Sequence, residues 1–172
     1  ANDKFRGSKS NNNDIIMPKS LLFAMRNTTR DDVTFLEGLK NENPMYAKLI
    51  LKQGDLLVRH ARNGHLKGID MIVTHKKREE LLQWIVVKMF KTACQENQVH
   101  VVNYMIDNGF PLDFPPVQEL VHELILNATD DRHRELIQIL GIKGFDVNYQ
   151  RPKDYFTLLH IAVKKGIFNI VA

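Results

Sequence analysis

The chain has 172 residues, of which 44% are hydrophobic and 26% are charged, and its formal net charge is +4. This balance is typical of a folded chain and excludes a disordered polyelectrolyte. The single cysteine, Cys94, excludes an internal disulfide and a metal site built from several thiolates, and it favours a reducing compartment. No apolar run is long enough to cross a membrane, and the polar N-terminus has no signal-peptide core. We therefore expect an intracellular protein, in the cytoplasm rather than the nucleus.

The first stretch of sequence is polar, and residues 1–17 are predicted to form a flexible lead-in. The segment that follows contains a weak helix–turn–helix pattern. Ala24 precedes a helix break near Thr28, and Val33 and Leu36 follow at the spacing of a buried helical face. We expect this segment to form either a first structural unit or a cap.

The same pattern recurs four times in the rest of the chain. A marker position in the first helix falls at residues 60, 93, 128 and 162, with 33 to 35 residues between successive markers. The residue there is alanine except in the first case, where the pair His60-Ala61 takes its place. Each marker is followed by a turn residue and then by a second helix with paired apolar residues. The turn residues are Gly64, Asn97, Arg132 and Gly166.

The period of about 33 residues and the motif "TLLHIA" at residues 157–162 resemble the ankyrin-repeat family. The resemblance implies an all-α, ankyrin-like helix-turn-helix solenoid of four to five irregular repeats over residues 18–172. The approximate units are 18–50, 51–83, 84–118, 119–152 and 153–172, of which the last is incomplete. Because the chain lacks an initial Met and stops in mid-pattern, we expect it to be a piece of a longer protein.

Particular residue types support this reading of the turns. Gly64 and Gly166 lie where the chain reverses between helices, and Gly109 and Gly144 lie at the ends of second helices. Such positions often require a positive φ, which glycine adopts freely and asparagine tolerates better than most other residues. The apolar segment "REELLQWIVV" departs from the polar fingers of the family, so we expect a helix extension or an apolar finger there.

Catalytic and metal-binding chemistry finds little support in the sequence. Cys94 follows the small residue of a first helix and is predicted to be a buried structural thiol rather than a nucleophile. The seven histidines include no His-x-x-x-His pair, and His60 and His65 are expected on different sides of a helix. Asp130 and Asp131 are expected to be solvated in a turn. We therefore expect no enzyme activity, no cofactor and no metal.

Surface recognition is the remaining function. The resemblance implies that positions flanking the small residue line a concave groove, and carrying them over unit by unit gives a groove that runs basic, neutral, acidic and basic. These residues are Arg59, Arg62, Asn63, Thr92, Gln95, Glu96, Asn127, Asp130, Asp131, Ile161, Lys164 and Lys165. Apolar residues expected in the fingers could anchor a partner or pack on the next unit: Trp84, Ile85, Phe114, Tyr149, Tyr155 and Phe156.

These features predict a protein–protein interaction module: a scaffold, an adaptor or a regulatory segment of a longer protein. One alternative is contact with nucleic acid or an anionic membrane through basic residues, which are Lys76, Lys77, Arg78, Lys88 and Lys91. Nucleic acid is not the expected partner because the groove lacks a continuous basic track. Another alternative is a regulatory domain of an enzyme or channel whose active part lies beyond Ala172.

Overall fold

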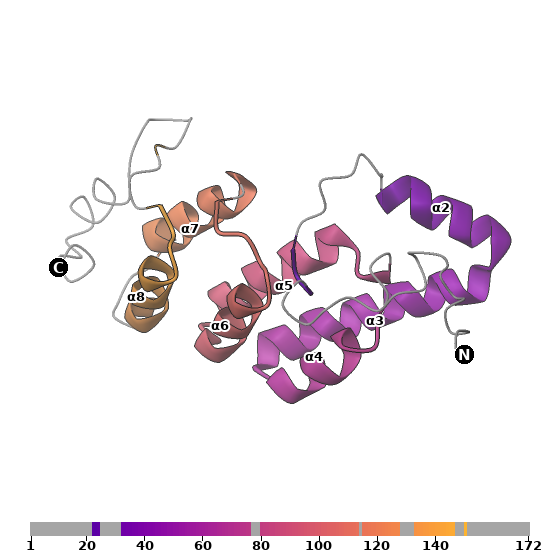
Figure 1. The fold of residues 1–172 in the computed structure, drawn as a ribbon, viewed down its shortest axis with the longest axis horizontal. Helices are drawn as coiled ribbons and strands as arrows, with labels where there is room; N and C mark the ends of the chain where they lie inside the picture. The colour runs from indigo at the N-terminus through magenta and orange to yellow at the C-terminus, as the bar shows by residue number, and fades with distance from the viewer. Residues whose placement is uncertain are drawn as a thin grey trace, which may run out of the picture.

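A computed structural model describes residues 22–24, 32–76, 80–113, 115–127, 133–146 and 150, and these residues form seven α-helices and no strand (Figure 1). The all-α character expected from the sequence is therefore confirmed for the described part of the chain. The helices are α2 (Asp32–Glu42), α3 (Pro44–Asn63), α4 (Leu66–Val73), α5 (Gln83–Gln95), α6 (Val99–Asp107), α7 (Pro115–Asn127) and α8 (Arg134–Ile142).

Six of the helices form three consecutive pairs: α3 with α4, α5 with α6, and α7 with α8. The pairs follow one another in chain order from the α2 end of the molecule to the α8 end (Figure 1). Their second helices begin at Leu66, Val99 and Arg134, which are separated by 33 and 35 residues. The helix–turn–helix period predicted from the sequence is thus present in the described helices.

The turn within a pair has the same geometry in the first two pairs. Gly64 and Asn97, 33 residues apart, both have positive φ, at 74° and 57°. In each turn the amide of the following residue donates to a carbonyl five residues earlier, that of His60 at 2.9 Å and that of Ala93 at 2.8 Å. This is the capping pattern that ends a helix with a left-handed residue, and it makes His60 the structural counterpart of Ala93.

The ends of the second helices also repeat. Gly109 and Gly144 have φ of 105° and 104°, which confirms the expectation for both glycines. The residue after each glycine is a buried phenylalanine, Phe110 or Phe145, whose amide donates to a carbonyl five residues earlier at 3.0 Å in both cases. Gly166 lies outside the described residues.

Helix α3 is longer than the first helices of the other pairs. It spans 20 residues because Asn43 caps it, its side-chain oxygen accepting from the Tyr46 amide at 3.2 Å, and because Pro44 fits the first helical turn. In the register set by Gly64 and Asn97, α3 begins six residues before the position equivalent to the start of α5. The approximate unit limits at 50/51 and 118/119 therefore fall inside α3 and α7.

Helix α5 begins at Gln83, so the apolar residues "QWIVV" form its first turns. Of the two expectations for this segment, the helix extension is therefore observed and the apolar finger is not. The Asp32 carboxylate of α2 accepts from the Gln83 amide at 2.8 Å and so caps α5 from 51 residues away. Leu81 and Leu82, just before the helix, are buried in the core.

The N-terminal segment differs from the expected first unit. Residues 22–24 form a turn rather than part of a helix, and the Phe23 amide donates to the Asn108 carbonyl at 3.0 Å. The Phe23 ring meets Tyr104 edge-on, with 5.8 Å between ring centroids, so this segment lies against α6 and not before α3. In α2, Leu36 is buried as expected, but Val33 is 57% exposed because it lies on the solvent side of that helix.

The two best-described pairs fill the space between their helices in complementary ways. Ala93 and Val101 are both fully buried in the α5–α6 pair. Their counterparts in the α3–α4 pair are His60 and Gly68, so a large residue faces a residue without a side chain. A Cβ atom placed on Gly68 would lie 2.8 Å from two atoms of the His60 ring. Gly68 therefore explains how His60 occupies a position that is alanine in the other units.

Among the described helices, none is both long and apolar enough to cross a lipid bilayer.

Candidate interaction surface

Side chains of each pair reach back to the turn of the pair before it. The Gln98 side-chain amide donates to the Arg62 carbonyl at 2.9 Å, and His133 Nε2 lies 3.5 Å from the Gln95 carbonyl. Gln98 and His133 are the residues just before α6 and α8, and each acceptor lies two residues before the turn position. This recurring link fixes the ends of the first helices relative to one another.

A second set of contacts joins the outer helices α4, α6 and α8. Tyr104 of α6 donates its hydroxyl to Asp70 of α4 at 2.5 Å, and burial together with this hydrogen bond raises the pKa of the tyrosine. Lys143, just after α8, pairs with Asp107 of α6 at 2.6 Å. These contacts tie each outer helix to the next one along the chain.

Helix α5 exposes one narrow stripe. Trp84, Lys88, Lys91 and Gln95 follow one another at spacings of four, three and four residues, which places them on one side of the helix. All four are exposed, Trp84 by 38%. The other sides of α5 are buried, so this stripe is the surface that α5 presents to solvent. It combines a large aromatic side chain with two cationic ones.

The neighbouring first helices continue this surface. In the register of the turns, Arg62 and Asn63 correspond to Gln95, the last residue of α5, and to its C-cap residue Glu96. Asp55 of α3 corresponds to Lys88, and all of these residues are exposed. The described exposed carboxylate of α7 is Glu123, with the partly exposed Glu119 one turn before it.

The surface therefore carries mixed charge on α3, where Asp55 and Arg62 are both exposed, and it is basic on α5 and acidic on α7. The sequence had predicted a neutral second position, and that prediction is wrong because Lys88 and Lys91 share the face of α5 with Gln95. The helical spacing of four, three and four residues from Trp84 to Gln95 could have shown from the sequence that these residues share one face. In the sequence-based reading, Trp84 was assigned to a finger and the two lysines to a separate basic patch.

Several residues expected at the surface are buried instead. Thr92 and Ile85 are each 6% exposed, and Ile85 lies against α3, where a Cβ atom on Gly54 would be 2.9 Å from its Cδ1. Lys76 is 4% exposed, its ammonium donates to the Gln53 side chain, and burial lowers its pKa. Lys76 therefore cannot take part in the basic contact expected from the sequence. Among the described residues, Lys88 and Lys91 are the members of that set that remain exposed.

Other residues named from the sequence lie outside the described part of the chain, or have side chains outside it. They are Lys77, Arg78, Phe114, Asn127, Asp130, Asp131, Tyr149, Tyr155, Phe156, Ile161, Lys164 and Lys165.

The candidate chemical residues have structural surroundings. Cys94 is fully buried, as predicted, and burial raises the pKa of its thiol. His60 and His65 were expected on different sides of a helix, but the turn at Gly64 brings their ring centroids to 5.6 Å. Burial, then the neighbouring His65 and Arg59, lower the pKa of His60. Within the described residues, no three His, Cys, Asp or Glu side chains come together as a metal site.

Comparison with known proteins adds one relative. The chain is 30% identical over 132 residues, which cover 71% of its length, to the ankyrin repeat and KH domain-containing protein mask-1 of Caenorhabditis elegans. It spans only 5% of the length of that protein. No family model matches the chain, and no solved structure matches it.

Proposed function

We propose that this chain is a divergent ankyrin-repeat segment whose function is to bind another protein through the exposed faces of α3, α5 and α7. The similarity to an ankyrin-repeat protein and the recurring helix–turn–helix pairs support this assignment. Repeats of this kind cannot fold alone, and they build an extended surface by stacking. The observed links between successive turns are what such stacking requires.

The Trp84 stripe of α5 is the observation that carries the proposal. Interface hot spots are enriched in Trp, and cations beside an aromatic side chain add directional contacts. Trp84 is flanked by Lys88 one turn later on the same face. The adjacent α7 offers Glu119 and Glu123, and the adjacent α3 offers both Asp55 and Arg62. A partner that presents acidic groups toward α5 and toward Arg62 of α3, and basic groups toward α7, would match these charges.

A protein partner fits this surface better than a polyanion. Glu119 and Glu123 follow the basic residues of α5 on the next first helix, and Lys76 is buried. A continuous backbone of phosphates would meet repulsion where the carboxylates begin. The salt dependence of binding separates the two ligand classes, because counterion release makes polyanion binding fall steeply with salt.

Site-specific photo-crosslinking tests the proposal. A photoreactive amino acid at Lys91, in the α5 stripe, should capture a protein partner from cells that express the chain. The same amino acid at Gln138, an exposed residue of the outer helix α8, is the matched control. Capture from position 91 that Trp84→Ala abolishes supports the proposal. Equal capture from both positions, or capture of nucleic acid alone, would contradict it.

A further inference from the structure

Helix α3 has a side that is largely exposed, although the equivalent side of α5 is packed against α3. In α5 and its N-cap residue, this side consists of Leu82, Ile85, Met89 and Thr92, all buried, with Ile85 lying against Gly54 of α3. The counterparts in α3, 33 residues earlier, are Leu49, Lys52, Leu56 and Arg59. We refer to these four α3 residues, together with Met45 one turn before Leu49, as the open face.

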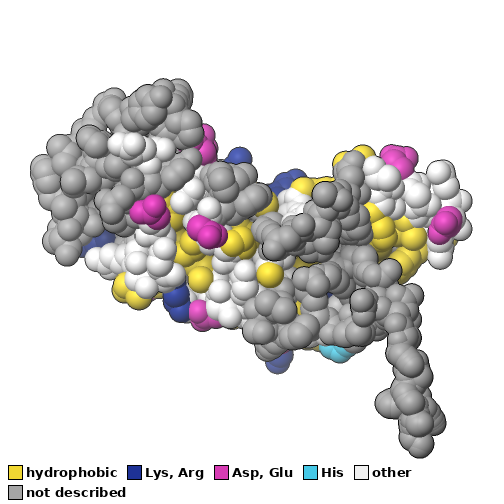
Figure 2. Space-filling view, turned by 45° about the horizontal axis from the view of Figure 1, so that its top comes forward, with side chains coloured by type: hydrophobic (Ala, Val, Ile, Leu, Met, Phe, Trp, Pro, Cys, Tyr) yellow, Lys and Arg dark blue, Asp and Glu magenta, His cyan; other side chains and the backbone are white. Residues whose placement is uncertain are grey.

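The open face remains accessible to solvent. Met45 is 76% exposed and Leu49 is 47% exposed, Lys52 and Arg59 are exposed, and Leu56 is half-buried. Figure 2 shows hydrophobic side chains gathered at the end of the molecule where α2 lies beside α3. An exposed helix face that combines large apolar side chains with cations is a candidate interaction surface.

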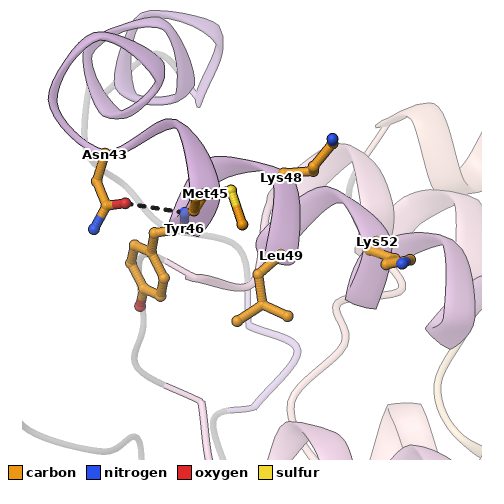
Figure 3. A pocket seen from close by; sticks show the side chains of 6 residues that line it. All are labelled: Asn43, Met45, Tyr46, Lys48, Leu49 and Lys52. Atoms are coloured by element: carbon orange, nitrogen blue, oxygen red, sulfur yellow. Dashed lines mark hydrogen bonds between the residues drawn. The ribbon is translucent and has the colours of Figure 1, made fainter.

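A hollow marks the N-terminal half of the open face. It has a volume of about 480 Å³ and is lined by Asn43, Met45, Tyr46, Lys48, Leu49 and Lys52 (Figure 3). A second hollow of about 330 Å³ shares Tyr46 and Leu49 with the first and continues toward α4 at Met71 and Ile72. The apolar floor and the lysines therefore come from consecutive turns of one helix.

We propose that the open face binds an acidic amphipathic helix of a partner protein, which stacks on α3 as α3 itself stacks on α5. Apolar side chains of that helix contact Met45, Leu49 and Leu56. Its carboxylates pair with Lys52 and Arg59, and with Lys48 at the rim. Within the described residues, no carboxylate forms an ion pair with these three cations. This surface is separate from the α5 stripe, so the inference goes beyond the proposed function.

Charge also decides against a second copy of the chain as the occupant. In a symmetric dimer the same patch meets itself, so the cations of the open face would lie in one interface with the cations of its copy. Like charges brought together in this way oppose association. Methionine and leucine at the same face adapt to apolar side chains of various shapes, which suits a helix presented by another protein.

The probe for the test is a stapled 18-residue helical peptide with leucines along one face and glutamates along its flanks. Titration into the full chain labelled at the methionine methyl groups gives a residue-specific signal. The methyl resonance of Met45 should shift, while those of Met89 and Met105, which are fully buried, should not. The Leu49→Glu variant and the Lys52→Glu/Arg59→Glu variant should each weaken binding by about tenfold or more.

Two controls keep the outcome specific. Ile142→Glu removes an 81% exposed apolar side chain from α8 at the other end of the molecule, and Lys88→Glu/Lys91→Glu makes the same charge change on α5. Both should bind the peptide as the natural chain does. A peptide with scrambled leucines that binds equally well would overturn the proposal, as would equal weakening by the α5 variant. Concentration-dependent self-association that Leu49→Glu abolishes would also overturn it, in favour of a second copy.

Discussion

The close contact between His60 of α3 and Gly68 of α4 predicts that a larger residue at position 68 is tolerated only when the residue at position 60 becomes smaller. Three variants test this prediction: Gly68→Val, His60→Ala and the double variant. The double variant gives the α3–α4 pair the residues that Ala93 and Val101 provide between α5 and α6. The free energy of unfolding should therefore fall in each single variant and largely recover in the double one.

The expected sizes follow from the geometry. A Cβ atom on Gly68 would lie 2.8 Å from the His60 ring, well inside the contact distance of about 3.5–4.0 Å between such atoms. Overpacking of this kind costs roughly 1–3 kcal/mol, against a helix-propensity gain of only about 0.4 kcal/mol for valine over glycine. Removing the half-buried His60 ring leaves a gap that costs about 1–2 kcal/mol. The double variant should lie within about 1 kcal/mol of the natural chain, which gives a coupling of about 2 kcal/mol.

Urea unfolding followed by far-ultraviolet circular dichroism measures all four proteins under one condition. The single tryptophan, Trp84, gives an independent fluorescence transition from the adjacent pair. If the effects of the two substitutions add within about 0.5 kcal/mol, the side chains do not share one space and the inferred register between the pairs is wrong.

Three further outcomes are expected. Gly64→Ala should lower the free energy of unfolding by about 2 kcal/mol or more, because alanine at this position must adopt a left-handed conformation and its Cβ atom would lie 2.5 Å from the Gln98 side-chain oxygen. Gly38→Ala, where a Cβ atom would meet nothing, should stabilise the chain slightly. Similar urea midpoints for the two variants would contradict this expectation. Because the folded-state pKa of His60 is lowered, the neutral ring is favoured in the fold, so its contribution to stability is present above the unfolded pKa of about 6.5 and is lost as pH falls. His60→Gln should therefore show a smaller loss of stability between pH 7.5 and 5.5, and an unchanged pH profile would argue against this reading. The Cys94 thiol should react with a thiol reagent only as fast as the chain unfolds; rapid labelling of the native chain would show that it is accessible.

Local signals in the sequence were sufficient to locate four turns of the described residues, whereas the predicted turns at Arg132 and Gly166 lie outside them. Gly64, Asn97, Gly109 and Gly144 all have the positive φ expected of them, because a left-handed turn residue is selected by its own backbone and needs no distant partner. The spacing of these residues then fixes the register between pairs. The Asn43-Pro44 start of α3 is also readable as a helix N-terminus, but the predicted unit limit was placed at 50/51, inside that helix.

Contacts between distant segments were not readable in the same way. Leu22 and Phe23 are buried, Phe23 contacts Tyr104 and Asn108 more than 80 positions later, and no periodic pattern connects the two segments. The burial of Thr92 depends on which side of α5 meets α3, and a polar residue gives no sign of that choice. Likewise, Lys76 reads as a solvated lysine until the Gln53 side chain from α3 reaches it.

The links between successive turns run in one direction along the chain. Gln98 completes the hydrogen bonding of a carbonyl that precedes it by 36 residues, and His133 does the same for a carbonyl 38 residues earlier. During synthesis on the ribosome, a helix pair therefore leaves the exit tunnel with this carbonyl open to water and gains its protein partner only when the next pair has emerged. Each of these hydrogen bonds therefore forms only after the next helix pair has been synthesised. A pause in translation between two pairs prolongs the time for which the last turn is stabilised only by its own helices.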